Sequence, residues 1–133
     1  MKQTFRELTV WQRAMQLTVS VYRLSQDFPR AEQFGLTSQL RRAAVSIPSN
    51  IAEGQGRTSK GEFRQFLGIA RGSNCEVQTQ LELARVLNFE QPEMICEAEV
   101  LSEEVRKMLF GLLESLKTPN GRNWELRTLN SEL

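Results

Sequence analysis

Residues 59–84 read SKGEFRQFLGIARGSNCEVQTQLELA, and this stretch predicts one long helix. Ser59 and Glu62 form the S-x-x-E pattern of a capping box, in which the serine oxygen accepts from the glutamate amide and the glutamate side chain reaches back. Beyond this start, one side-chain track recurs at intervals of four and three residues, the spacing of one helix face. Its members are Phe63, Leu67, Ala70, Asn74, Val77, Leu81 and Ala84. A helix over residues 59–88 would be about 45 Å long.

The flanking sequence predicts three further helices. Residues 8–27 carry two interleaved apolar tracks that together cover roughly 160° of the helix, so this helix is expected to have two partner surfaces. Residues 36–53 repeat apolar side chains every three to four positions. Pro48 interrupts that pattern and predicts a kink or break at residues 46–48, because proline lacks a backbone donor and crowds the preceding turn. Residues 92–117 begin with proline and carry a heptad stripe.

Four helices with short connections, and no alternation typical of strands, predict an all-α protein. The expected architecture is an antiparallel up-down-up-down four-helix bundle, because short connections place consecutive helices side by side. The bundle domain is assigned to residues 1–118 and a C-terminal tail to residues 119–133. The pattern leaves open whether this tail docks on a neighbour or stays mobile, since its large apolar residues are scattered: Trp124, Leu126, Leu129 and Leu133.

Composition favours one folded domain without familiar enzyme chemistry. The chain has 133 residues, 40% of them hydrophobic, and no histidine, which excludes Ser-His-Asp nucleophile systems and HExxH zinc sites. No enzymatic activity, catalytic residue, metal or cofactor is therefore assigned. Without an apolar run of about 20 residues or a signal-peptide core, a cytoplasmic location and no membrane contact are expected. Cys75 and Cys96 are expected to be reduced, buried thiols.

Charge is distributed unevenly along the chain despite a net charge of +1. Residues 1–75 carry 11 Lys or Arg and 5 Asp or Glu, giving +6, whereas residues 76–133 carry 6 and 11, giving −5. Such asymmetry is typical of a basic binding face or of attraction between the halves or between subunits. The acidic run of the last predicted helix is interpreted as a solvent-facing side rather than a metal site: Glu97, Glu99, Glu103 and Glu104.

A basic cluster surrounds the turn into the long helix and consists of Arg57, Lys60, Arg64 and Arg71. Phosphate groups bind such clusters, so these residues are candidates for contact with nucleic acid or a partner. The turn does not match the phosphate-binding pattern GxxxxGK[ST], and few aromatic residues are interleaved for base stacking. A solvated or inter-subunit charged face is the alternative.

Polar residues of the second predicted helix form a stripe with 3,4 spacing. The stripe is either a solvated face or a buried polar seam between subunits, because small polar side chains can hydrogen-bond across a close contact. Its members, with Asn50 adjoining, are Gln39, Arg42, Ser46, Ser49, Asn50 and Glu53.

Gly68 and Gly72 lie inside the long helix, where each glycine costs about 1 kcal/mol relative to alanine. Close helix packing against small residues of the second helix would offset that cost, and a ligand near the backbone is the alternative. Replacing either glycine with leucine is accordingly expected to damage folding or assembly. Asn74, on the apolar track, is expected to fix helix register or oligomeric state.

Four segments resemble proteins of a known family: LTVWQ at residues 8–12, FGLTSQLRRAAVSIPSNIAEG at 34–54, GIARGS at 68–73 and EVQTQL at 76–81. Together they are similar to the four-helix bundle proteins named for intervening sequences of 23S ribosomal RNA genes. The resemblance covers roughly residues 5–117 of this chain.

The resemblance implies a cytoplasmic bundle that assembles as a homopentameric ring and has no catalytic activity. Distant relatives similar in fold include accessory proteins of diversity-generating retroelements, which bind nucleic acid and a reverse transcriptase. The expected function is thus that of an oligomeric, non-enzymatic bundle that engages RNA, or an RNA-bound protein, through a basic surface. A pure protein scaffold without nucleic-acid binding is the alternative.

Overall fold

The structure, a computed structural model, describes residues 4–117. The chain forms, in order, η1 (Phe5–Glu7), α1 (Thr9–Ser25), η2 (Arg30–Glu32), α2 (Leu36–Gln55), α3 (Lys60–Val86) and α4 (Pro92–Ser115), where η1 and η2 are single 3-10 turns. The described residues contain no strand, so the all-α class is confirmed for them. The expected tail, residues 119–133, lies outside this range.

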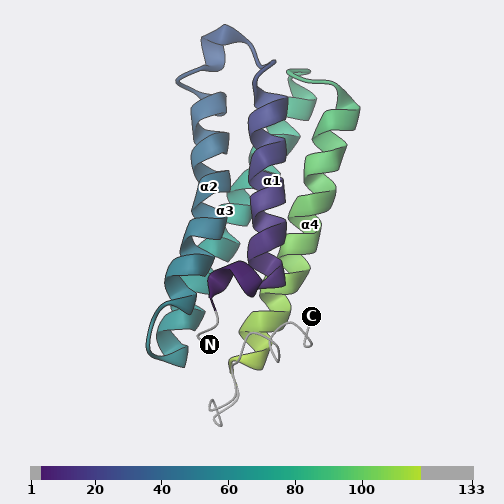
Figure 1. The fold of residues 1–133 in the computed structure, drawn as a ribbon. Helices are drawn as coiled ribbons and strands as arrows, with labels where there is room; N and C mark the ends of the chain where they lie inside the picture. The colour runs from purple at the N-terminus through teal and green to yellow at the C-terminus, as the bar shows by residue number, and fades with distance from the viewer. Residues whose placement is uncertain (1–3, 118–133) are drawn as a thin grey trace.

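The four α-helices enclose one hydrophobic core. Figure 1 shows consecutive helices running in opposite directions, with η1 and the end of α4 at the same end of the bundle. α1 and α3 each pack against both α2 and α4. The largest fully buried side chains of this core are Phe63, Leu8, Leu17, Leu24, Leu40, Ile47, Ile51, Leu67, Leu81, Ile95, Leu109 and Leu112.

α3 begins where its sequence predicts. The Ser59 Oγ accepts from the Glu62 amide at 3.1 Å and donates to the Glu62 carboxylate, also at 3.1 Å, so the serine cap and the return of the glutamate side chain toward it are confirmed. The helix ends at Val86, where Asn88 adopts a left-handed φ of 57°. The Asn88 and Phe89 amides then donate back to the carbonyls of Arg85 and Ala84, the two bonds of a Schellman motif.

α2 runs from Leu36 to Gln55 through Pro48, so no break occurs at residues 46–48, whereas the alternative, a kink there, stays a prediction. Proline leaves the carbonyl of Ala44, four residues earlier, without its helical donor. The hydroxyl of Thr18 on α1 fills that role, since Thr18 Oγ1 lies 3.1 Å from the Ala44 oxygen and 2.8 Å from the Ala14 oxygen. A donor from another helix therefore allows α2 to continue.

The sequence predicts that both apolar tracks of α1 are covered by a partner, and in the structure one of the two tracks is buried. The track from Val10 to Leu24 is fully buried in the core. The second track includes Trp11, Met15 and Tyr22. Trp11 is partly buried, and Met15 and Tyr22 are exposed. One of the two expected partner surfaces is therefore the core of this chain, and the other is covered only in part by the described residues.

Candidate nucleic-acid and subunit interfaces

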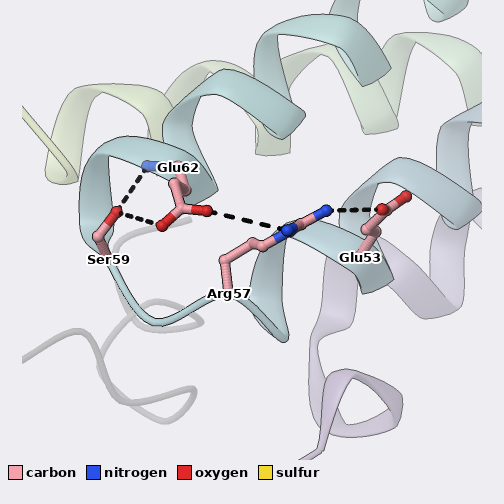
Figure 2. Close-up of polar contacts among 4 residues, drawn as sticks. All are labelled: Glu53, Arg57, Ser59 and Glu62. Carbon is pink, nitrogen blue, oxygen red and sulfur yellow. Dashed lines mark hydrogen bonds and ion pairs between the residues drawn. The ribbon is translucent and has the colours of Figure 1, made fainter.

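Arg57, the first residue of the basic cluster, is held by acidic side chains of its own chain. Its Nη2 donates to Glu53 Oε1 at 2.9 Å, and its Nη1 lies 4.0 Å from Glu62 Oε2 (Figure 2). Its guanidinium also stacks 4.8 Å from the centre of the Phe66 ring. These contacts brace the turn between α2 and α3. The two carboxylates also offset the positive charge of Arg57, with which a phosphate group would otherwise pair.

The other three basic residues lie along α3. The side chain of Arg71 is exposed and forms no ion pair with the described residues. Arg64 is partly buried, and its Nε has no hydrogen-bond partner in residues 4–117. Lys60 is also partly buried, in the first turn of α3. The structure thus separates a neutralised Arg57 from two arginines, Arg64 and Arg71, whose charges are not paired with any carboxylate in residues 4–117.

The polar stripe of α2 divides into two groups. Ser46 Oγ lies 2.8 Å from Ser73 Oγ on α3, and the Asn50 amide donates to the Ser46 hydroxyl at 2.9 Å. Ser46 therefore joins α2 to α3 within the chain through Ser73, and Asn50 supports it from within α2. The remaining members are exposed or partly exposed and stay candidates for a contact between subunits: Gln39, Arg42, Ser49 and Glu53.

Gly68 and Gly72 do not make the close contact with α2 that was expected. A Cβ added at either position would meet no atom within 4 Å, because both residues lie on the outer side of α3. Within the described chain this expectation is wrong. The close helix approach occurs instead at Gly54, where a Cβ would lie 2.6 Å from the Cβ of Phe66.

Gly68→Ala is therefore expected to raise the free energy of unfolding by up to about 1 kcal/mol, the difference in helix propensity. Urea denaturation of dilute protein measures this change, with Gly72→Ala as a second, independent case. A clear loss of stability in both variants would contradict the open surroundings of these glycines. Loss of assembly in Gly68→Leu without loss of stability would place the contact in a neighbouring copy.

Asn74 lies in the core and is only 1% exposed. Its Nδ2 donates to the Ser102 carbonyl at 3.0 Å, and the Ser102 hydroxyl donates to its Oδ1 at 2.7 Å. This pair connects α3 to α4 at one height of the bundle. It satisfies both ends of the asparagine amide, which leaves no polar group of Asn74 aimed at a ligand.

Three acidic residues of α4, which point in different directions, pair with separate arginines. Glu104 Oε2 lies 3.0 Å from Arg13 Nε on α1, whereas Glu99 pairs with Arg85 on α3. Glu103 pairs with Arg106 on its own helix, and the hydrogen bond from Arg106 lowers the pKa of the Glu103 carboxyl. No group of three or more metal-ligating side chains gathers in residues 4–117.

Both cysteines are free and exposed. The expectation that they are buried is wrong, because Cys75 and Cys96 lie on the outer sides of α3 and α4 rather than on the core tracks. No helix in residues 4–117 has the length and apolar character of a membrane-spanning segment.

The outer face of α1 is the apolar surface that the sequence pattern indicated without locating. Beside α2 it forms a groove of about 370 Å³. The exposed Met15 and Val45, from α1 and α2, contribute apolar surface to it. The groove is lined by Trp11, Met15, Thr18, Val45, Pro48, Ser49 and Ala52. The second apolar track of α1 was the sequence signal for this surface. The groove also includes Ser49, a member of the polar stripe that has no partner on α3.

Comparisons with known proteins agree with this fold. A crystal structure of a protein of unknown function from the S23 ribosomal protein family of Bacteroides thetaiotaomicron superposes with a TM-score of 0.74. It is 23% identical, and the match covers 80% of this chain and 99% of that chain, which shows a shared fold. No curated protein matches the chain. The family profile described as 23S rRNA-intervening sequence protein matches residues 6–111, and the chain belongs to that family.

Proposed function

We propose that this protein is a non-enzymatic assembly module whose copies associate side by side through the α1–α2 face and contact RNA through α3. The α1–α2 face comprises the exposed apolar residues of α1 and the neighbouring exposed residues of α2. The observation that carries the proposal is the second apolar track of α1, which the core leaves uncovered. Apolar patches of this kind, rimmed by polar residues, are typical of protein interfaces.

Side-chain chemistry supports a contact between copies at this face. Tyr22 stacks under the guanidinium of Arg41 at 4.7 Å, which gives the face an aromatic residue with a polar rim. Trp11 lies in the groove, and aromatic residues and arginine are enriched in interface cores. Ser49 and Arg42, on the outer side of α2, supply hydrogen-bond donors at its edge.

The division of charge supports a cyclic arrangement. Among the described residues, one ion pair, Arg13–Glu104, joins the basic first half of the chain to the acidic second half. Most basic residues of the first half and most acidic residues of the second half are therefore not paired with each other within the described chain, and they can form contacts between copies. Head-to-tail interfaces, in which a basic surface of one copy meets an acidic surface of the next, form a ring where the rotation between copies closes, and a ring of five subunits is proposed here.

Val45→Asp is expected to dissociate the assembly, because it places a charge in the α1–α2 face at a residue already 40% exposed. Sedimentation equilibrium at micromolar concentration measures the mass. Ile69→Asp is the matched control, since Ile69 is a β-branched residue on α3 with 48% exposure. A wild-type chain that stays monomeric contradicts assembly, and dissociation by the control alone contradicts the assigned face.

The RNA contact is proposed for Arg64 and Arg71, whose charges no carboxylate in residues 4–117 offsets. With a net charge of +1, long-range attraction is weak, so binding is expected to be sequence-tolerant and confined to low salt. A ring would bring several copies of this arginine pair to one RNA.

Arg71→Glu is expected to weaken binding to a structured RNA and to flatten the slope of log K against log salt by about 0.7 for each phosphate that the protein no longer neutralises. Arg30→Glu is the control, because it changes the net charge equally at an exposed position of η2. Equal salt slopes for the two variants contradict the assigned contact. Absence of wild-type binding at low salt favours the second candidate, a pure protein scaffold, which the neutralisation of Arg57 by Glu53 and Glu62 also supports.

A further inference from the structure

Phe110 of α4 carries an aromatic ring that the core does not use. It is 55% exposed, although α4 continues for five more residues beyond it. Its ring stacks on no other ring and under no cation in residues 4–117. An exposed aromatic ring without a stacking partner is a surface on which a nucleic-acid base can stack.

The register of α3 and α4 places Phe110 level with the two arginines of the proposed RNA contact. The hydrogen bonds between Asn74 and Ser102 set these two residues at the same height. From Asn74 toward the start of α3, Arg71 is about 4.5 Å away and Arg64 about 15 Å away, at 1.5 Å per residue. From Ser102 toward the end of α4, Phe110 is about 12 Å away. The two helices are antiparallel, so these directions agree and the ring lies between the two arginines in height (Figure 1).

The same three side chains also share one side of the bundle. The ion pair between Arg85 and Glu99 marks the side on which α3 and α4 meet at the surface. Arg71 and Arg64 precede Arg85 by two and three heptads, an interval that keeps residues on one side of a helix with a drift of about 20° per heptad. Phe110 follows Glu99 by 11 residues, which is about three turns. This side, with Arg64, Arg71 and Phe110, is called the α3–α4 flank below.

The carboxylates of α4 nearest to this flank are already paired. Glu99, Glu103 and Glu114 each form an ion pair with a lysine or an arginine. Arg64 and Arg71, in contrast, pair with no carboxylate in residues 4–117. The flank therefore combines two positive charges with an aromatic ring between them. Phosphates and bases are the two groups that such a surface binds together.

We propose that the α3–α4 flank binds single-stranded RNA, with an unpaired base stacked on Phe110 and neighbouring phosphates paired with Arg64 and Arg71. This inference rests on the proposed RNA contact and specifies its ligand, because it requires nucleotides that are not held in a duplex. A base within a duplex is stacked on its neighbours, whereas an unpaired base can be splayed out onto a protein ring. A structured RNA is therefore bound at its loops, bulges or ends. Stacking accepts every base, in agreement with the sequence-tolerant binding expected above.

Fluorescence anisotropy at low salt tests the proposal with a short labelled oligouridylate and a labelled RNA duplex of the same length. Phe110→Leu is expected to weaken binding of the single strand about tenfold, through the loss of one stacked base. Duplex binding, which depends on phosphate contacts alone, is expected to stay unchanged. The slope of log K against log salt is also expected to stay that of the wild type, because Phe110 neutralises no phosphate, whereas Arg71→Glu flattens it.

Phe34→Leu is the matched control, because it removes another exposed ring. Phe34 is 91% exposed just before α2, at the end of the bundle opposite to Phe110 (Figure 1). This control is expected to leave both affinities unchanged. Phe110→Trp keeps a stacking surface and is expected to retain the wild-type affinity for the single strand. Circular dichroism verifies that each variant is folded.

A third probe, an oligouridylate whose central nucleotides lack bases, keeps every phosphate and is expected to bind about tenfold more weakly than the intact strand. Equal binding of these two strands, or wild-type affinity in Phe110→Leu, overturns the inference and leaves the arginine contact standing. Equal wild-type affinity for single strand and duplex also overturns it. A wild type that binds no probe contradicts the RNA contact itself, and the inference with it. Sedimentation of Phe110→Leu reports assembly separately, and dissociation would assign Phe110 to a contact between copies and overturn the inference.

Discussion

Gly54→Ala is expected to destabilise the bundle by about 2 kcal/mol, although alanine is the better helix former by about 1 kcal/mol. Gly54 lies in the last turn of α2, where an added Cβ would be 2.6 Å from Phe66 Cβ and 3.1 Å from Phe63 Cδ1. The Phe66 Cβ is fixed to the backbone of α3, so it cannot move away by rotation of its side chain. The two helices must separate, which also disturbs the buried Phe63.

The measurement is thermal or urea unfolding, with an expected fall in Tm of about 8 °C for a domain of this size. Gly68→Ala is the matched control, because it makes the same chemical change in a helix with no neighbour within 4 Å. The two substitutions should therefore change stability in opposite directions. Equal stability of Gly54→Ala and the wild type would contradict the close approach of α2 and α3.

Asn74→Ala is expected to cost about 3 kcal/mol of folding free energy, from two broken hydrogen bonds, a small cavity and an unpaired buried hydroxyl. The partner Ser102 is fully buried, so water cannot replace the amide. Asn74→Leu with Ser102→Ala removes both polar side chains and keeps the same branched arrangement of heavy atoms at position 74. This double variant is expected to be close to the wild type in stability, because no side-chain polar group of the pair is left unsatisfied.

Urea unfolding of the wild type, of Asn74→Leu, of Ser102→Ala and of the double variant that combines them gives the coupling between the two side chains. A coupling energy of about 1 kcal/mol or more is expected for this buried pair. Additive effects would show that the hydrogen bonds do not act together. Loss of a single register in the double variant, seen as a broadened unfolding transition, would show that the pair also specifies how α3 and α4 align.

Local signals in the sequence predicted the helices well. The features that the sequence did not predict depend on contacts between different helices. The start of α3 follows from Ser59 and Glu62 because a capping box is complete within four residues. The continuity of α2 through Pro48 depends on Thr18, which belongs to another helix. Periodicity carries no information about such a donor.

The candidate site shows the same division. Glycine spacing indicated a close approach but not its position, since spacing does not specify which side of α3 faces α2. Gly54, interpreted as lying outside the end of α2, is the glycine that packs against α3. The pairing of Arg57 with Glu53 could have been predicted, because residues four apart on a helix are neighbours.

The shared hydroxyl of Thr18 has an evolutionary consequence. It donates to a carbonyl that proline at position 48 leaves without its helical donor. If position 48 mutated to a residue with a backbone amide, that carbonyl would recover its helical donor, and selection for a hydroxyl at position 18 would relax. Positions 18 and 48 are therefore expected to covary among descendants of a common ancestor, with hydroxyl-bearing residues at position 18 retained in lineages that keep the proline.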